Sequence, residues 1–147
     1  MKNESQTPFE PSGILHPLRT LIVDDSTLFL SCLRRLLGEQ PLVQVVGTAA
    51  NGNEALQKAD VLTPDLMLMD LHMPGVDGLE ATVLLRRRLP NTRIIIMTLD
   101  ETGKNKAVAR AHGAHGFVGK NRIVDDLMTE IASVFRLKPA DEKKGAA

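Results

Sequence analysis

Short apolar runs alternate along this chain with longer segments whose apolar positions recur every three or four residues. The runs hold four to six residues, too few for buried helices, and are typical of strands covered on both faces. Strands are therefore predicted at residues 19–23, 43–48, 66–69, 93–97 and 116–119. Helices are predicted after each of them, at residues 26–39, 51–63, 77–89, 102–112 and 122–137.

The residues at the segment ends support these boundaries. Ser26, Asn51 and Asp77 each precede a helical pattern and can accept hydrogen bonds from the first free amides of a helix. Pro64 stops the second helix, because its ring clashes with a continuing helix. Gln44 places a polar side chain within the second strand and indicates an edge position.

Most of the predicted helices carry one apolar face. The third helix is expected to bury Leu79, Val83 and Leu84, and the last helix has seven apolar positions at helical spacing: Ile123, Val124, Leu127, Met128, Ile131, Val134 and Phe135. The fourth helix has a thin face of Ala107, Val108 and Ala111. A helix that buries so little apolar area is weakly held and is a natural candidate for a moving part.

Strands separated by helices pair in parallel through right-handed crossovers, with helices on both faces of the sheet. The expected fold is therefore α/β, a (βα)5 three-layer sandwich around a parallel five-stranded sheet. The strand order 2-1-3-4-5 is adopted from flavodoxin-like folds, because the pattern by itself does not fix it.

Composition narrows the class of protein. At 147 residues the chain is expected to form one domain over residues 19–137, after a flexible leader at residues 1–18 and before a polar tail at residues 138–147. The 18 Lys and Arg residues balance the 18 Asp and Glu residues. A balanced charge gives no field that attracts nucleic acid or an anionic membrane, so direct binding of nucleic acid is not expected.

Cys32 is the only cysteine, so no internal disulfide can form, which fits a reducing compartment. Its apolar neighbours Phe29, Leu33 and Leu36 lead us to expect a small buried core residue. The N-terminus lacks a long apolar segment for secretion or membrane insertion. A cytoplasmic protein without membrane contact is expected.

Polar residues follow four of the five predicted strands. Asp24 and Asp25 end the first, Asp70 the third, Thr98 the fourth, and Lys120 the fifth. Each alone has an ordinary explanation: helix capping for the acidic pair, a turn for Asp70, a strand end for Thr98 and a solvated lysine for Lys120. Because parallel strands end at one edge of the sheet, where open α/β folds bind ligands, the joint pattern predicts one site.

The residue types indicate phosphoryl transfer. Clustered carboxylates repel one another, and Mg²⁺ relieves this while keeping water positions for an incoming phosphate. Asp70 could then act as nucleophile and become an acyl phosphate. Lys120 would add positive charge, and the Thr98 hydroxyl would donate a hydrogen bond to a phosphoryl oxygen.

These residues lie in the motifs LIVDDS, LMLMDLHMPGVDGLE, IIIMT and GAHGFVGK. With them the chain resembles the receiver domain of a two-component response regulator from Arg19 to Leu137. The resemblance implies that Asp70 is the phosphoacceptor and that Asp25, Asp70 and the backbone carbonyl of His72 bind Mg²⁺. It also implies that Asp24 acts largely through a metal-bound water.

The resemblance assigns further roles. Thr98 and Lys120 would contact the phosphoryl group, and Phe117 matches the aromatic that changes rotamer on activation; an ordinary core role for Phe117 stays open. His72, Leu99 and Asp100 occupy positions that modulate phosphoryl lifetime. Leu99 departs from the small residue usual after the switch threonine, and we expect it, with His72, to slow attack by water on Asp70.

The resemblance also implies partners. The phosphoryl donor would be a histidine kinase or a histidine phosphotransfer protein, and the output surface would be the fourth helix, last strand and last helix. The target would be a protein or a missing output domain, since VDDSTLFLSCLRRLL resembles receivers that precede helix-turn-helix domains. A phosphorylation-dependent dimer, a stand-alone receiver and a piece of a longer regulator all remain open.

Three other classes of protein share parts of this pattern. Haloacid-dehalogenase-type phosphatases carry a second Asp two residues after the nucleophile, where this chain has His72, so we expect no enzyme beyond self-catalysed transfer to Asp70 and its autodephosphorylation. Glycine-rich nucleotide motifs follow none of the strands. A degenerate receiver acting as a phosphate-independent scaffold is the alternative kept open.

Overall fold

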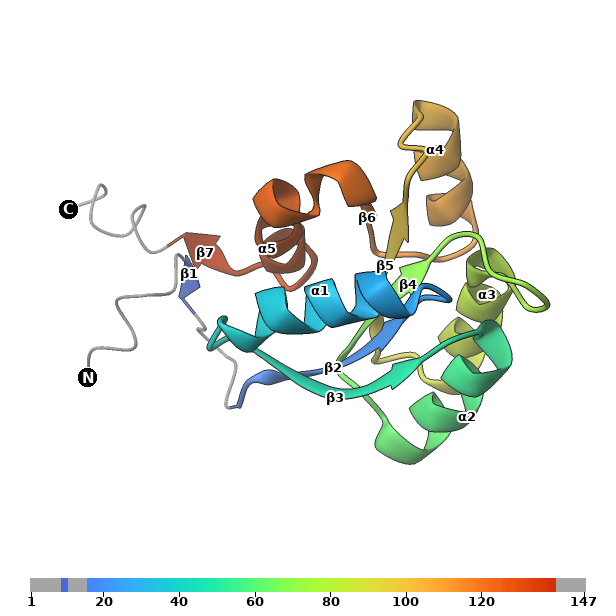
Figure 1. Cartoon of the computed structure of the whole chain (residues 1–147), viewed down its shortest axis with the longest axis horizontal. Helices are drawn as coiled ribbons and strands as arrows, with labels where there is room; N and C mark the ends of the chain where they lie inside the picture. Colours follow the sequence, from blue (N-terminus) through green and yellow to red (C-terminus); the bar gives the residue numbers. More distant parts are fainter. Residues whose placement is uncertain (1–8, 11–15, 140–147) are drawn as a thin grey trace.

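A computed structural model of the chain describes residues 9–10 and 16–139. Its main sheet has five strands in the order β3-β2-β4-β5-β6, all paired in parallel, with helices between them (Figure 1). The strands are β2 (Leu18–Val23), β3 (Val43–Ala49), β4 (Leu66–Asp70), β5 (Arg93–Thr98) and β6 (Gly116–Gly119). Counted along the sheet this is the order 2-1-3-4-5, and β3 lies at an edge, so both predictions are confirmed.

Five α-helices complete the sandwich: α1 (Thr27–Gly38), α2 (Gly52–Leu62), α3 (Gly78–Arg88), α4 (Gly103–Ala111) and α5 (Ile123–Val134). A short 3-10 helix, η2 (Lys120–Arg122), joins β6 to α5. Ser26, Asn51 and Asp77 cap α1, α2 and α3 with their side chains, as predicted.

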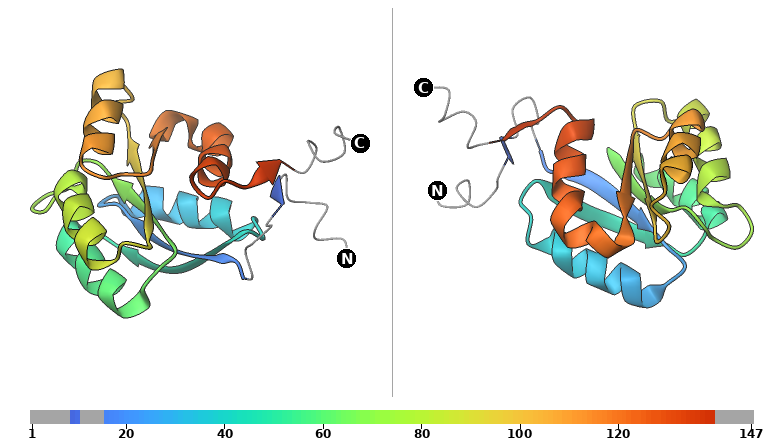
Figure 2. Two further views of the ribbon diagram at one scale, coloured as in Figure 1. Left: turned by 180° about the vertical axis from the view of Figure 1, so that it is seen from behind. Right: turned by 90° about the horizontal axis from the view of Figure 1, so that it is seen from above.

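Two apolar clusters fill the space on either side of the sheet. One joins the sheet to α2, α3 and α4, and the other joins it to α1 and α5. The view from above shows these two groups of helices on opposite faces of the sheet (Figure 2). β4 lies in the middle of the sheet, and all five of its residues are buried. A central strand covered on both faces is the environment that its unbroken apolar run predicts.

Several helix faces differ from the prediction. In α3 the buried residues are Gly78, Ala81, Thr82 and Leu85, and Leu79, Val83 and Leu84 are only half-buried. In α4 the sole buried residue is Ala109, while Ala107 and Ala111 are exposed. Val124, in the first turn of α5, is 72% exposed. Small residues let α3 and α4 approach the sheet closely. Because small side chains contribute little to the periodic pattern of apolar residues, that pattern does not reveal these buried faces.

Cys32 is exposed, so the prediction of a buried core residue is wrong. The buried residues of α1 are Leu33 and Leu37, one helical turn apart. Cys32 precedes Leu33 by one residue, which is about 100° around the helix, and this turns its side chain to the surface.

Two short strands pair outside the main sheet. β1 (Phe9–Glu10) and β7 (Lys138–Pro139) are antiparallel to each other and lie together at one end of the molecule (Figure 1). The predicted leader and tail thus each contribute two residues to a small ribbon. The remaining residues of these segments, 1–8, 11–15 and 140–147, lie outside the described residues.

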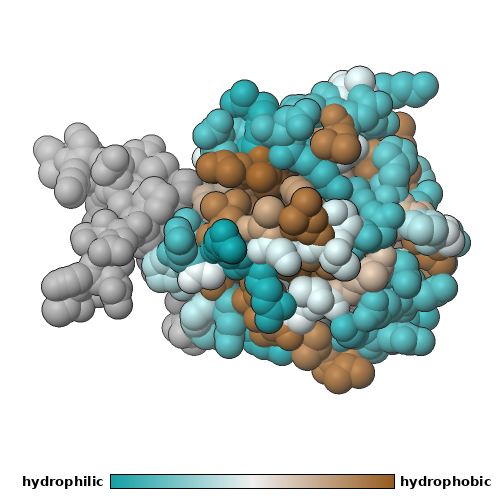
Figure 3. Space-filling view, viewed as in Figure 1, coloured by the Kyte–Doolittle hydropathy of each residue, from teal (hydrophilic) through white to brown (hydrophobic). Residues whose placement is uncertain are grey.

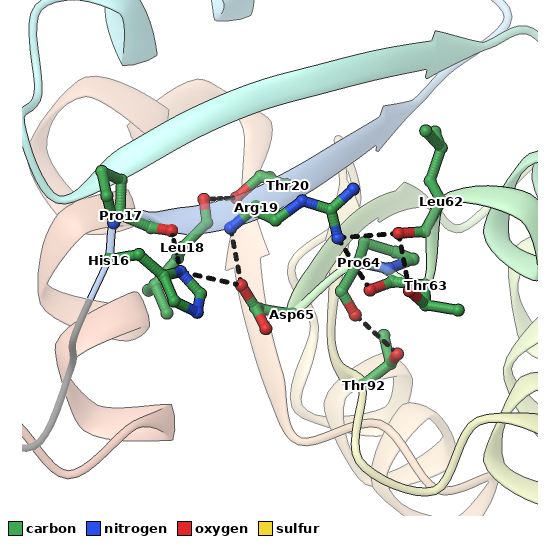
Figure 4. A network of polar contacts seen from close by, with 10 residues as sticks. All are labelled: His16, Pro17, Leu18, Arg19, Thr20, Leu62, Thr63, Pro64, Asp65 and Thr92. Carbon is green, nitrogen blue, oxygen red and sulfur yellow. Dashed lines mark hydrogen bonds and ion pairs between the residues drawn. The ribbon is translucent and has the colours of Figure 1, made fainter.

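A polar network ties the amino ends of β2 and β4 to α2 (Figure 4). Arg19 donates from its backbone to Asp65 Oδ2 at 2.8 Å and from its guanidinium to Leu62 O at 2.7 Å, at the end of α2. Thr92 Oγ1 donates to Pro64 O at 2.7 Å. These bonds satisfy backbone groups where the helix ends, and they fix the start of β4.

Among the residues that the structure describes, no helix is long and apolar enough to cross a membrane.

Candidate functional site

The carboxyl edge of the sheet gathers the acidic residues that the sequence singled out. One carboxylate oxygen from each of Asp24, Asp25 and Asp70 lies within 4.8 Å of the others. Asp24 follows the last residue of β2, and Asp70 is the last residue of β4, the neighbouring strand. Asp24 is fully buried, whereas Asp25 is exposed. Three carboxylates at this spacing concentrate negative charge at the carboxyl edge of the sheet.

Lys120 supplies the positive charge of the site. Its Nζ atom lies 2.6 Å from Asp24 Oδ2 and 3.2 Å from Asp70 Oδ1. The ammonium also lies 4.6 Å from the centre of the Phe29 ring, at the start of α1. This cation–π contact keeps the lysine stem against an apolar surface while its end faces the acids. Sequence reasoning missed Phe29, because nothing in the sequence brings α1 to the end of β6.

The pKa values of the two central groups follow from this geometry. Burial raises the pKa of the Asp70 carboxyl, the negative charge of Asp24 raises it further, and Lys120 opposes both. Burial of Lys120 favours its neutral form, but the contacts with Asp24 and Asp70 outweigh this and raise its pKa. Lys120 therefore stays protonated and positively charged. The three carboxylates of the cluster carry more negative charge than this one ammonium group balances.

The donor set fits a hard divalent cation. Asp24 Oδ1 accepts a hydrogen bond from Ser26 N at 2.9 Å, which orients the carboxylate. Among the buried side-chain nitrogen and oxygen atoms of the described residues, only Asp24 Oδ2 has no hydrogen bond of good geometry. Its close contact is the ion pair with Lys120. Carboxylate oxygens are the ligands that Mg²⁺ takes, together with water, and Asp25 and Asp70 offer such oxygens beside Asp24.

Thr98 is buried at the end of β5, beside the end of β4. Its Oγ1 atom accepts a hydrogen bond from Asp100 N at 3.1 Å, which leaves the hydroxyl proton free to donate elsewhere. Asp100 O in turn accepts from the side chain of Asn105, in α4, at 2.9 Å. Two hydrogen bonds thus connect Thr98 to α4. The sequence predicted Thr98 but not Asn105.

Phe117 is half-buried on β6 and packs against the cluster under α2, α3 and α4. It is paired with Ile96, two residues before Thr98 along β5. Its backbone amide donates to Glu130 Oε2, in α5, at 3.0 Å. Side chains two residues apart on a strand share a face, so Phe117 and Thr98 point to the same side of the sheet.

The three residues expected to influence phosphoryl lifetime, His72, Leu99 and Asp100, are all exposed, and Leu99 is 67% exposed. Gly78, the first residue of α3, is a further residue of the site. A Cβ atom at Gly78 would lie 2.2 Å from Asp70 O, so the glycine lets α3 begin directly against the acceptor residue.

A family model described as the response regulator receiver domain matches residues 20–132. A protein-glutamate methylesterase/protein-glutamine glutaminase of Methanosarcina acetivorans is 35% identical over 130 residues, 83% of this chain and 37% of that protein. Response regulator GacA of Pseudomonas viridiflava is 37% identical over 118 residues, 80% of this chain and 55% of that protein. The chain thus spans about half or less of the length of these curated relatives.

Solved structures agree with this family. A two-component response regulator of the LuxR family from Aurantimonas sp. SI85-9A1 aligns with a TM-score of 0.77 and 32% identity, over 82% of this chain and 86% of that one. The response regulator domain of Thermotoga maritima CheB gives a TM-score of 0.75 and 30% identity, over 84% of this chain and all of that one. The chain belongs to the response regulator receiver domain family, as its motifs indicated.

Proposed function

We propose that this chain is a phosphoacceptor receiver of a two-component or phosphorelay system, in which Asp70 takes a phosphoryl group from a histidine kinase or a histidine phosphotransfer protein. The contact that supports this proposal most directly is that of Lys120 Nζ with Asp70 Oδ1, at 3.2 Å, inside a cluster of three carboxylates. A nucleophilic carboxylate, a fixed cation and a cation-binding acidic set are the parts that phosphoryl transfer needs.

Mg²⁺ would be held by Asp25, Asp70 and the backbone carbonyl of His72, with Asp24 acting largely through a bound water. When bound, this ion neutralises charge on the phosphoryl oxygens. Asp24 holds Lys120 in place, because its Oδ2 atom lies 2.6 Å from the ammonium. Lys120 therefore remains charged and oriented before the phosphoryl group arrives.

The transfer is an in-line displacement at phosphorus. One Oδ atom of Asp70 forms the new O–P bond as the P–N bond to the donor histidine breaks and its electron pair returns to the imidazole. Lys120 then pairs with a phosphoryl oxygen, and the free proton of the Thr98 hydroxyl donates to another. The chemistry stays on Asp70, so the chain acts on itself and turns over no separate substrate.

The signal leaves the site through Thr98. Movement of Thr98 toward the phosphoryl group pulls on Asp100 and, through it, on Asn105 in α4. α4 is free to respond, because Ala109 is its only buried residue. Phe117 then takes the space that the loop before α4 leaves, and the population shifts between two existing conformations.

The output surface is the face formed by α4, β6 and α5. On the side of the molecule seen in Figure 3, apolar side chains gather over α5 where it borders α1. A downstream protein, an output domain of the same polypeptide or a second receiver would bind at the output face in the cytoplasm. The chain itself is not expected to bind nucleic acid.

Leu99 and His72 set the phosphoryl lifetime by crowding the approach of water to Asp70, with Asp100 as a further modulating position. Both crowding side chains are exposed at the loops that follow the ends of β5 and β4. Leu99→Ala should shorten the lifetime of the acyl phosphate, measured as loss of the phosphoryl mass with time. An unchanged decay rate would remove this role for Leu99.

Intact-protein mass spectrometry after incubation with Mg²⁺ and acetyl phosphate tests the main proposal. Wild type should gain the mass of one phosphoryl group, Asp70→Asn should not, and Asp125→Asn, an exposed acid in α5, should behave as wild type. Binding of beryllofluoride is measured alongside. Binding without the mass gain would mean a competent site that requires a protein donor. Neither result in wild type would favour the phosphate-independent scaffold.

A further inference from the structure

A groove lies at the edge of the sheet opposite to Asp70. It has a volume of about 660 Å³ and is formed where α3 and α5 end and where β5 and β6 begin. Its lining residues are Arg86, Pro90, Arg93, His115, Ser133, Val134, Phe135 and Arg136. The proposed receiver chemistry uses none of them.

The charged side chains that line this groove are all arginines. Arg86, Arg93 and Arg136 come from three different segments, and no carboxylate is among the lining residues. In the part of the chain that the structure describes, none of these three arginines is in an ion pair, whereas Arg88 pairs with Asp60 at 3.2 Å and Arg122 with Asp126 at 2.9 Å. Arg86 Nη1 donates to Pro90 O at 3.3 Å and Arg93 Nη1 donates to Asn91 O at 3.5 Å, so each of these guanidinium groups keeps further N–H donors for an anion.

The backbone is shaped to hold Arg86 there. Gly113 follows α4 with a φ angle of +107°, and a Cβ atom built on it would lie 2.9 Å from Arg86 Cγ. A side chain at this position would push the arginine stem away. Arg86 is half-buried, so its position is fixed more firmly than that of a solvated residue at a helix end.

His115 adds a neutral donor. Its Nδ1 atom accepts a hydrogen bond from Ile94 N at 3.0 Å, which assigns the proton of the neutral ring to Nε2. Burial, together with the positive charges of Arg86 and Arg93, lowers the pKa of His115 to about 4. At neutral pH the ring therefore offers an N–H group to an acceptor without adding to the positive charge.

Val134 and Phe135 form an apolar wall beside these polar groups. α5 reaches this position because Gly116 has no side chain: a Cβ atom there would lie 2.9 Å from Val134 Cγ2. The groove therefore combines a cationic end with an apolar side, and its volume exceeds that needed for an inorganic ion. Pockets of several hundred Å³ with few convergent polar groups are typical of sites for small molecules.

We propose that this groove binds a small organic phosphate, with Arg86, Arg93 and Arg136 on the phosphate oxygens and the carbon body against Val134 and Phe135. Guanidinium groups match phosphate oxygens with paired N–H donors, and several of them from different directions suit a multi-oxygen anion better than a single carboxylate. This site is separate from Asp70 and does not depend on its phosphorylation.

Isothermal titration calorimetry of the full chain without Mg²⁺ tests the proposal, with phenyl phosphate, inorganic phosphate and chloride at equal ionic strength. Phenyl phosphate should bind saturably with one site and at least several-fold more tightly than phosphate, and chloride should give no saturation. Arg93→Gln should weaken binding at least tenfold. Arg87→Gln, on the exposed side of α3, is the matched control and should bind as wild type, as should Asp70→Asn.

Arg136→Gln is a second variant, because its side chain is exposed and its loss leaves the sheet intact if Arg93→Gln fails to fold. Amide chemical shifts of Ile94 and His115 should move during the same titration. Equal affinities for the two phosphates would contradict the contact of the carbon body with Val134 and Phe135, and would overturn the proposal in favour of a site for free phosphate. Non-saturating heats, or equal binding by Arg87→Gln, Arg93→Gln and Arg136→Gln, would overturn the proposal.

Discussion

Lys120 and Asp24 form a short ion pair across the two outer strands of the site, with Nζ 2.6 Å from Oδ2 and the carboxylate completely buried. The pair does more than join β6 to β2. It holds the Lys120 ammonium group beside an acidic cluster whose carboxylates repel one another. It also places this ammonium group 3.2 Å from Asp70 Oδ1. Stability and readiness for chemistry therefore depend on the same contact.

Asp24→Asn should lower the free energy of unfolding by about 1–3 kcal/mol at pH 7 without metal, because a buried ammonium loses one of its two close carboxylates. Relief of the repulsion between Asp24 and Asp70 offsets part of the loss. Urea denaturation measures the difference. Asp25→Asn, at an exposed residue of the same cluster, should change stability by less than about 0.5 kcal/mol. If the two variants changed the free energy of unfolding equally, the buried ion pair would contribute no more to stability than the exposed carboxylate.

Mg²⁺ should stabilise the wild-type chain, because an ion that binds only the folded acidic cluster adds its binding energy to folding. At ten times its dissociation constant, one ion adds about 1.4 kcal/mol. Thermal unfolding with and without MgCl₂ measures this. Asp25→Asn should lose most of the stabilisation, and Asp125→Asn, away from the cluster, should retain it. A Mg²⁺ effect that is equal in both variants would point to general screening of charge.

The alternation of short apolar runs with helical patterns was enough to predict the strands, the helices and their parallel pairing, whereas the strand order was adopted from flavodoxin-like folds. The predicted bounds of β6 agree with the structure, and α4 differs by one residue at each end. The parts that failed were the packed faces of α3 and α4. There Ala81 and Ala109 lie against the sheet. A small side chain carries little hydropathy signal, although its size is what permits the close approach.

The candidate site shows a similar division. The meeting of Asp24, Asp70 and Lys120 was predictable, because parallel strands must end at one edge. The contacts of Phe29 with Lys120 and of Asn105 with Asp100 were not, since both depend on how helices are placed relative to strand ends. No local pattern in the sequence encodes those distances.

Asn105→Ala should loosen α4. The side-chain amide of Asn105 donates to Asp100 O at 2.9 Å, and a bond of this kind contributes about 0.5–1.5 kcal/mol. Hydrogen exchange of the α4 amides should therefore become about 2- to 10-fold faster, while the amides of β4 are unaffected. Asn53→Ala, at an exposed position of α2, is the matched control. If α4 exchanges at the wild-type rate, the bond to Asp100 does not hold the helix.

Stability should decrease as the pH falls from about 6.5 to about 4, through His115. Burial, with the charges of Arg86 and Arg93, lowers the pKa of this histidine from 6.5 to about 4. Between these two pH values the histidine is protonated in the unfolded chain and neutral in the folded chain. The full stability is present above the unfolded pKa. With allowance for partial exposure, the loss attributable to His115 by pH 4 is roughly 1–3 kcal/mol.

His115→Asn removes the titrating ring, while its side-chain oxygen can still accept from Ile94 N. Its urea midpoint should vary less between pH 7 and pH 4.5 than that of wild type. His112→Asn, at an exposed residue after α4, should keep the wild-type pH dependence. The same slope in all three proteins would assign the acid sensitivity to other groups.

Gly78→Ala should disturb the acceptor residue without touching its side chain. The added methyl group would lie 2.2 Å from Asp70 O, far inside contact distance, so either the start of α3 or the end of β4 must move. We expect a loss of about 2–4 kcal/mol in the free energy of unfolding, as for other overpacked sites.

Gly38→Ala is the matched control, because a Cβ atom at Gly38, in the last turn of α1, meets nothing within 4 Å. There alanine should be neutral or stabilising by up to about 1 kcal/mol, since it restricts the unfolded chain. Urea denaturation of both variants separates the two cases. A Gly78→Ala protein as stable as wild type would mean that α3 shifts without cost, and the close approach of Gly78 would then not be what fixes Asp70 at the edge of the sheet.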